Sequence, residues 1–333
     1  MSVLHTACMS KQRRRGVVLG AGGVLGAAWM MGALEALHAA TGFEPRDAEV
    51  VVGTSAGSIL AAFAGCGIGV DTMSRHQRGE VADGDPQIAF DYEKDTGGSL
   101  PPRPRLRLGS PGLLRSTVRH PLAVTPTTAL MSILPAGRGS LQPVGDLVAG
   151  VAPEEWPIRP KTWIVAMDYE SGKRVVFGRD GAPEAWLPDA VRASCAIPAW
   201  FEPVTIGGRR YTDGGTCSAT SADLLAPLGL DEVYVLAPMA SYEDDHPHDL
   251  ITKLERRYRR SVTRRLDREV AKVRASGARV VVLAPNAEDL RAIGVNLMDA
   301  GRRLDVFHTA ARTTAASLSM QGVRQASARP LAG

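Results

Sequence analysis

The sequence predicts an α/β fold with a mostly parallel central sheet and helices on both of its faces. Continuous apolar runs rich in β-branched residues indicate buried strands at residues 17–19, 50–52, 233–236 and 280–283. Helical patterns separate these runs, and strands that alternate with helices are typical of a parallel sheet covered on both sides. Glycine-rich turns after the first two runs would let strand and helix pack closely.

The composition is that of a soluble globular protein. The chain has 333 residues, of which 44% are hydrophobic and 22% are charged, so it can bury a large core. A net charge of +4 gives no support for binding nucleic acid. The cysteines have no Cys-x-x-Cys spacing, which argues against structural zinc and a disulfide framework; they are Cys8, Cys66, Cys195 and Cys217. We therefore expect a cytoplasmic protein, with a peripheral position at the inner face of the membrane as an alternative.

Residues 1–14 form a basic stretch without periodicity, which we expect to be a flexible tail. Its last arginines and Arg15 precede an uncharged segment over 16–34, and this order resembles a secretory or twin-arginine signal. Cleavage near Ala27 would remove the glycine-rich turn that follows the first strand. A functional role for that turn and a cleaved signal therefore exclude each other.

The first strand leads into a glycine-rich turn at residues 20–26 (GAGGVLG) and then into a helix over about 27–40. Such a turn presents backbone N–H groups at a helix N-terminus, where negative charge is favoured. It could hold a dinucleotide pyrophosphate or an oxyanion. The dinucleotide fingerprint requires a glycine at the sixth position, where Leu25 stands, and no strand followed by an acidic residue lies at the expected distance.

The second strand runs into Gly53-Thr54-Ser55-Ala56-Gly57, a Gly-x-Ser-x-Gly pattern, and a helix of small residues follows. This order is typical of a nucleophile elbow, a strained turn that exposes the serine hydroxyl while the glycines let strand and helix pass closely. Ser55 is therefore the candidate nucleophile. The alternative is a helix-capping serine beside packing glycines.

The chain between this turn and residue 145 has the composition of an insertion. Residues 83–98 are acidic and loop-like, whereas 96–145 lack acidic residues and interleave apolar side chains with Arg103, Arg105, Arg107, Arg115, Arg119 and Arg138. We expect 83–145 to form a cap over the site, with a cationic part that approaches anionic lipid headgroups. A solvated insertion is the alternative.

Further strands and helices are predicted downstream. Residues 163–167 and 174–177 predict a β-hairpin, and 187–195 predict a helix that Pro198 ends. Gly207 and Gly208 mark a turn between two short strands.

The last third of the chain contains a long basic helix over about 251–274, with a single apolar stripe. Residues 253–274 hold ten basic and three acidic side chains. We expect the stripe to dock on the protein, with contact to an anionic membrane or an acidic partner as the alternative. Acids and histidines gather at 241–249, where we expect a solvated loop rather than a metal site. The segment 299–328 predicts a last helix.

Four blocks together resemble the patatin-like phospholipase family. They are the glycine-rich turn, the Gly-x-Ser-x-Gly pattern, a proline loop at 193–198 (ASCAIP) that continues to 201–204 (FEPV), and an Asp-Gly-Gly within 211–215 (YTDGG). The blocks follow the order of the family and cover about residues 15–240. The chain departs at two positions, because Ala21 stands where the family usually has glycine and Leu25 where it has arginine.

The resemblance implies a patatin-like three-layer sandwich and a Ser–Asp dyad in which Asp213 acts directly on Ser55. The backbone N–H groups of Gly22 and Gly23 would form the oxyanion hole. Partial burial would raise the pKa of the carboxyl above its usual value of about 4 and make it a better base. The glycines that support these motifs are Gly20, Gly26, Gly53, Gly57, Gly214 and Gly215.

The predicted activity is hydrolysis of carboxylic esters of phospholipids, lysophospholipids or related lipids through an acyl-Ser55 intermediate. It requires no metal and no organic cofactor, and the lipid is the expected partner, with membrane contact through 96–145 and 251–274. The predicted domain covers 15–300, followed by a C-terminal helix and tail at 301–333. Three alternatives stay open: an acyltransferase with the same dyad, an inactive protein that binds lipid or nucleotide, and a triad completed by His246, His248 or His308.

Overall fold

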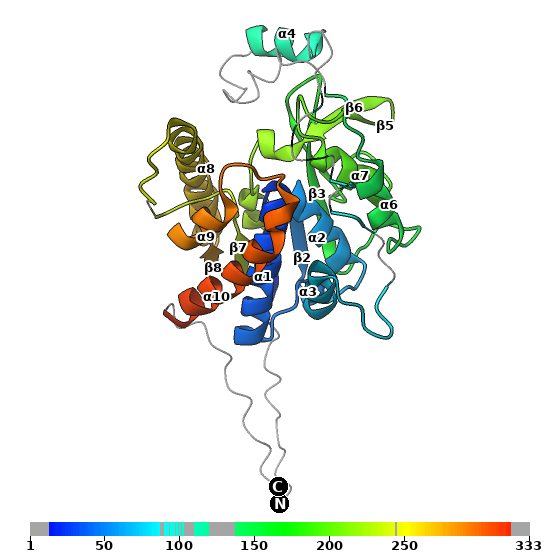
Figure 1. The fold of residues 1–333 in the computed structure, drawn as a ribbon. Coiled ribbons are helices and arrows are strands. Elements are labelled where there is room, and N and C mark those ends of the chain that lie inside the picture. The colour runs from blue at the N-terminus through cyan, green and yellow to red at the C-terminus, as the bar shows by residue number, and fades with distance from the viewer. Residues whose placement is uncertain are drawn as a thin grey trace, which may run out of the picture.

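The computed structural model describes residues 13–86, 90–92, 94–96, 98, 100, 102, 110–119, 137–243 and 245–320. A single sheet of eight strands runs through it in the order β5-β6-β3-β2-β1-β7-β8, and β4 also pairs with β3 (Figure 1). The strands are β1 (Arg15–Leu19), β2 (Val50–Thr54), β3 (Lys161–Asp168), β4 (Arg174–Phe177), β5 (Val204–Ile206), β6 (Arg209–Asp213), β7 (Glu232–Leu236) and β8 (Arg279–Leu283).

The sheet is mixed but mostly parallel, as predicted. Strand β1 pairs in parallel with β2 and β7, while β2 pairs in parallel with β3, and β7 with β8. The antiparallel partners are β4 and β6 on β3, and β5 on β6. The predicted hairpin is confirmed as β3 and β4, and Gly207 and Gly208 form the turn between β5 and β6.

Helices cover both faces of the sheet, which confirms the predicted fold class. Alternate strand residues point to opposite faces, so Val17 joins one apolar cluster and Val18 the other. The larger cluster includes side chains of α1 (Gly23–Thr41), α2 (Ala56–Gly65), α3 (Val70–Arg78), α6 (Gln142–Ala149), α7 (Leu187–Cys195), α9 (Ala287–Ile293) and α10 (Arg303–Met320). The smaller cluster lies under α8 (Leu250–Ala275) and the 3₁₀ helix η3 (Ala222–Leu228).

The apolar stripe of α8 docks over only half of the helix, which corrects the prediction of one docked stripe. Leu266, Val270 and Val273 are buried in the smaller cluster, but Ile251 and Leu254 near the start of the helix are exposed. The first half of the helix is held by charged side chains on another face, a pattern that apolar periodicity does not reveal.

Parts of the predicted tail and cap lie outside the described residues. Within the predicted tail, Arg14 donates hydrogen bonds to Glu49 and to the carbonyl of Gly229, so the chain is anchored by that residue. Within the predicted cap, α4 (Pro111–Arg119) buries Leu113 against Met167 and Cys217. The predicted last helix is α10, and the end of 299–328 lies beyond the described residues. The division into tail, main domain and C-terminal segment stays a prediction.

None of the helices in the described ranges has the length and apolar character that crossing a membrane would require.

Candidate active site

Ser55 lies in a sharp turn between β2 and α2. Its backbone has φ 52° and ψ −124°, and residues other than glycine rarely adopt such a positive φ. The flanking glycines make the turn possible. A Cβ on Gly57 would lie 2.0 Å from the carbonyl oxygen of Leu19, and one on Gly53 would lie 2.5 Å from the carbonyl oxygen of Gly57. The Gly-x-Ser-x-Gly pattern thus forms the strained elbow that the sequence predicts.

Ser194 fixes the backbone of this turn. Its hydroxyl accepts a hydrogen bond from the Ser55 N–H at 2.8 Å and donates one to the carbonyl of Val165 at 2.6 Å. Ser194 is itself buried near the end of α7. Sequence reasoning placed Ser194 in the proline loop but assigned it no role, because its partner is far away in the chain.

Strand β3 brings Asp213 next to this turn. Thr54 at the end of β2 pairs with Val165, and Asp213 at the end of β6 pairs with the next residue, Ala166. Because β4 occupies the other edge of β3 at these positions, β2 and β6 share one edge and meet end to end. Ser55 follows the end of β2, Asp213 ends β6, and these two strand ends pair with consecutive residues of β3. The two residues therefore lie close together although they are far apart in the sequence.

Asp213 is buried, and its carboxyl lies beside the side chain of Ser55. Burial raises the pKa of this carboxyl to about 6, while the neighbouring Ser55 side chain and the hydrogen bond from the Gly215 N–H act to lower it. The bond from the Gly215 N–H to Asp213 Oδ1 measures 2.6 Å. On the backbone, the Asp213 N–H donates to the carbonyl of Ala196 at 3.0 Å. The segment that follows α7 therefore supports Asp213, just as Ser194 supports Ser55.

The glycine-rich turn lies beside this pair. A Cβ on Gly215 would lie 3.2 Å from the Cβ of Ala21, and one on Gly22 would lie 2.9 Å from the ring of Pro238. Gly23 has φ 62° and begins α1. Among the hydrogen bonds of the described residues, none uses the N–H of Gly22 or Gly23, whereas the N–H of Gly20 and Ala21 are bonded to carbonyls of Leu236 and Ala219.

The remaining predicted glycines support these contacts. A Cβ on Gly214 would lie 2.4 Å from the carbonyl oxygen of Val165, which is the carbonyl that Ser194 binds. A Cβ on Gly26 would lie 3.4 Å from Pro238, and one on Gly20 would lie 3.2 Å from the same ring. The structure therefore brings together all of the predicted site residues. Pro238 packs against three of the glycines and was missed, because nothing near it in the sequence marks it.

An apolar cavity of about 90 Å³ opens beside Ser55. Ile59 and Met298 contribute to its wall, and so do Phe90, Tyr92 and Leu141 from the predicted cap. Burial raises the pKa of Tyr92 to about 12, and the guanidinium of Arg303 lies 4.5 Å from the centre of its ring. The described part of the predicted cap thus lines the space next to the nucleophile.

The alternative chemistries have no comparable geometry in the described residues. No histidine there lines this cavity, and His246, His248 and His308 are all exposed. No group of three or more His, Cys, Asp or Glu side chains in the described ranges could hold a metal ion. A larger cavity of about 290 Å³ lies between the end of β8 and α10, but none of the predicted site residues lines it.

Comparisons with known proteins find one matching family and similar solved structures. A family model described as patatin-like phospholipase matches residues 17–226. The fold is similar to the crystal structure of VipD from Legionella pneumophila, at 14% identity and a TM-score of 0.44 over 93% of this chain and 67% of that one. It is also similar to the type III effector protein ExoU, at 18% identity and a TM-score of 0.38 over 93% of this chain and 53% of that one. The chain thus spans about two thirds and about half of the length of these proteins.

Proposed function

Because the chain belongs to the patatin-like phospholipase family, we propose that it is a lipid acyl hydrolase in which Ser55 and Asp213 form the catalytic dyad. One observation carries this proposal. The carboxyl of Asp213 is buried beside Ser55 at the shared edge of β3, and its pKa of about 6 leaves it ionised but basic near neutral pH. A carboxyl with an ordinary pKa of about 4 would be a weaker base.

The reaction begins when Ser55 Oγ attacks the ester carbonyl and Asp213 takes the hydroxyl proton. Negative charge then develops on the former carbonyl oxygen, and the N–H groups of Gly22 and Gly23 stabilise it. The alcohol leaves with the proton that Asp213 holds, and an acyl-Ser55 ester remains. Asp213 then accepts a proton from the water that attacks this ester. The bond between the acyl carbon and Ser55 Oγ breaks, Asp213 returns the proton to Ser55 Oγ, and the fatty acid is released.

The cavity beside Ser55 supports a lipid as the substrate. Its wall is apolar, with Ile59, Phe90 and Met298 among its residues, so it suits an acyl chain rather than a polar group. The N–H donors need no side chain in the glycine-rich turn. Leucine at position 25, where the family has arginine, is therefore compatible with the mechanism.

Covalent labelling with a fluorophosphonate tests the proposal, together with turnover of a soluble short-chain ester and a phospholipid panel. The Ser55→Ala protein should lose the label and all turnover. The Asp213→Asn protein should lose at least about a hundredfold in kcat, because a general base contributes about that much or more.

Ser276→Ala provides the matched control, since this serine is exposed at the end of α8. It should label and turn over like the unmodified protein. A labelled and active Ser55→Ala protein would refute the dyad. An added alcohol that outcompetes water for the acyl group would instead identify an acyltransferase.

A further inference from the structure

The first turns of α8 expose their apolar side chains and bury two of their arginines. Arg256 and Arg259 are only 5% and 0% exposed, whereas Ile251 and Leu254 are 72% and 69% exposed. A helix on the surface of a soluble protein usually has the opposite arrangement. The reversed arrangement ends by Leu266, which is buried in the core.

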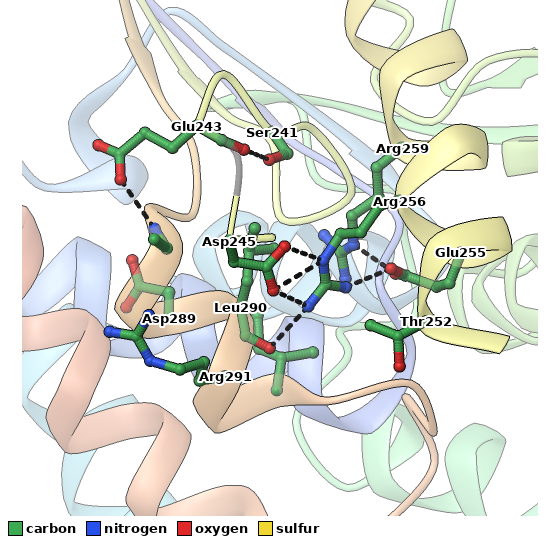
Figure 2. A network of polar contacts seen from close by, with 12 residues as sticks. Ser241, Glu243, Asp245, Thr252, Glu255, Arg256, Arg259, Asp289, Leu290 and Arg291 are labelled. Atoms are coloured by element: carbon green, nitrogen blue, oxygen red, sulfur yellow. Dashed lines mark hydrogen bonds and ion pairs between the residues drawn. The ribbon is translucent and has the colours of Figure 1, made fainter. Parts of the chain in front are cut away.

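A network of ion pairs holds the two arginines inside (Figure 2). Arg256 donates to Asp245 from Nε at 2.9 Å and from Nη2 at 2.7 Å, and Glu255 accepts from both arginines. Arg259 also donates to the carbonyl of Pro238 at 2.6 Å. Since a buried guanidinium that loses its partners is strongly destabilising, the network fixes which face of the helix points inward. The apolar side chains consequently stay outside.

The exposed side chains form two adjacent groups along the helix. At about 100° per residue, four apolar residues fall within one arc of about 100°; this apolar patch consists of Leu250, Ile251, Leu254 and Tyr258, all exposed. The neighbouring side of the helix carries four exposed basic residues without an ion-pair partner among the described residues; this basic ridge consists of Lys253, Arg257, Arg260 and Arg264.

This half of α8 lies at the rim of the candidate active site. Arg259 of this helix donates a hydrogen bond to the carbonyl of Pro238. The ring of Pro238 in turn packs on the glycine-rich turn, close to Gly22. In Figure 1 the helix stands at the edge of the fold beside β7 and β8.

We propose that the apolar patch and the basic ridge dock the protein on an anionic bilayer surface, with the Ser55 cavity turned towards the lipid. Helices that lie in a membrane interface combine an apolar side with lysine and arginine, which attract anionic headgroups. The charge of the ridge favours this occupant over a second copy of the chain, because two ridges would repel each other. The inference rests on the proposed function for the identity of the lipid as substrate, but docking itself can be measured without turnover.

Vesicle sedimentation tests the apolar patch. The protein should bind vesicles of phosphatidylcholine with phosphatidylglycerol, and Ser55→Ala is used as the background so that no lipid is consumed. Adding Ile251→Ser should weaken partitioning about tenfold, and Ile251→Ser with Leu254→Ser about a hundredfold, because each buried aliphatic side chain contributes about a factor of ten or more. Ile158→Ser is the matched control, since Ile158 is 75% exposed just before β3, and it should bind unchanged.

The basic ridge is tested with Lys253→Gln, Arg257→Gln and Arg260→Gln together. Binding to anionic vesicles should fall about fivefold for each charge removed and depend less on salt, while binding to neutral vesicles stays the same. Equal binding by the patch variant and the control would overturn the proposal. So would a dimer, seen by gel filtration, that Ile251→Ser dissociates without any effect on vesicle binding.

A soluble short-chain ester separates this inference from the proposed function. Ile251→Ser in the active protein should hydrolyse that ester at the unmodified rate. If Ser55→Ala also hydrolyses it, the dyad fails and the docking surface stands. If vesicle binding is absent while Ser55 is required for turnover, the docking surface fails and the dyad stands.

Discussion

Replacing Asp213 with asparagine should lower kcat at least about a hundredfold and at the same time remove a pH-dependent loss of stability from the folded protein. The ordinary pKa of this carboxyl is 3.8, and burial raises it to about 6 in the folded protein. Folding therefore takes up a proton in this range, so stability falls as the pH rises from 3.8 to about 6 and is constant above. That difference in pKa corresponds to about 3 kcal/mol.

An asparagine cannot ionise, so the variant does not incur this cost at high pH. The amide could cost some stability of its own by lacking hydrogen-bond partners, but that cost does not depend on pH. The quantity to measure is therefore the free energy of unfolding of Asp213→Asn minus that of the unmodified protein. This difference should increase by about 2.5 kcal/mol between about pH 4 and about pH 8, because the unfolded chain is already partly ionised at pH 4.

Urea denaturation followed by fluorescence of the five tryptophans gives both free energies. Asp146→Asn is the control, because Asp146 is exposed on α6 and accepts a hydrogen bond from Gln142 that asparagine could also accept. Its difference from the unmodified protein should stay within about 0.5 kcal/mol at every pH. If the Asp213→Asn difference is equally flat, the carboxyl does not carry a buried charge in the folded state and the reasoning fails.

Three further predictions concern the same site. The value of kcat/KM should be half-maximal at about pH 6 and fall about tenfold per pH unit below that, since the proposed base must be ionised; a profile that stays flat through this range would contradict the role of the base. Gly57→Ala should lower the free energy of unfolding, measured in urea, by about 3 kcal/mol or more, because the new Cβ would lie 2.0 Å from the Leu19 carbonyl oxygen. Gly150→Ala should have little effect, because its Cβ would lie 3.6 Å from the carbonyl oxygen of Asp146. Ser194→Ala leaves the Ser55 N–H without its acceptor, so it should cost about 1–3 kcal/mol of stability and reduce kcat; unchanged kcat would show that this hydrogen bond does not position the nucleophile.

Much of the fold could be predicted because the information is local. The β-branched run before Gly53, the glycine at position 57 and the small residues after it favour the strand, the turn and the helix independently. The same holds for α7, where Pro198 follows the helix end as predicted. Such segments are set by neighbouring residues and need no knowledge of distant partners.

The arrangement of the site depends on contacts that local sequence does not encode. Asp213 reaches Ser55 only because β6 pairs with β3 in the register that starts at Ala166, and a pairing between such distant segments leaves no periodic signal. The resemblance to a family supplied the pairing, because the residues alone did not connect Asp213 with Ser55. The support from Ser194 and Pro238 could not be predicted for the same reason.

The reversed face of α8 shows a different limit. The stripe of Ile251, Leu254 and later residues has helical spacing, and the usual inference is burial along its whole length. Burial of Arg256 instead depends on Asp245 from the preceding loop, which the helix pattern does not include. Apolar periodicity therefore located the helix correctly but assigned the wrong face to its first half.

The shared edge of β3 has a consequence for how the pair of Ser55 and Asp213 could be moved to another protein. Val165 and Ala166 are consecutive, so the ends of β2 and β6 have a common frame, and a shift of the outer helices or of the rim leaves their separation unaltered. A minimal graft would consist of three strand ends with their turns and the serine that braces them. Most of the surrounding layers could then be exchanged for a different scaffold.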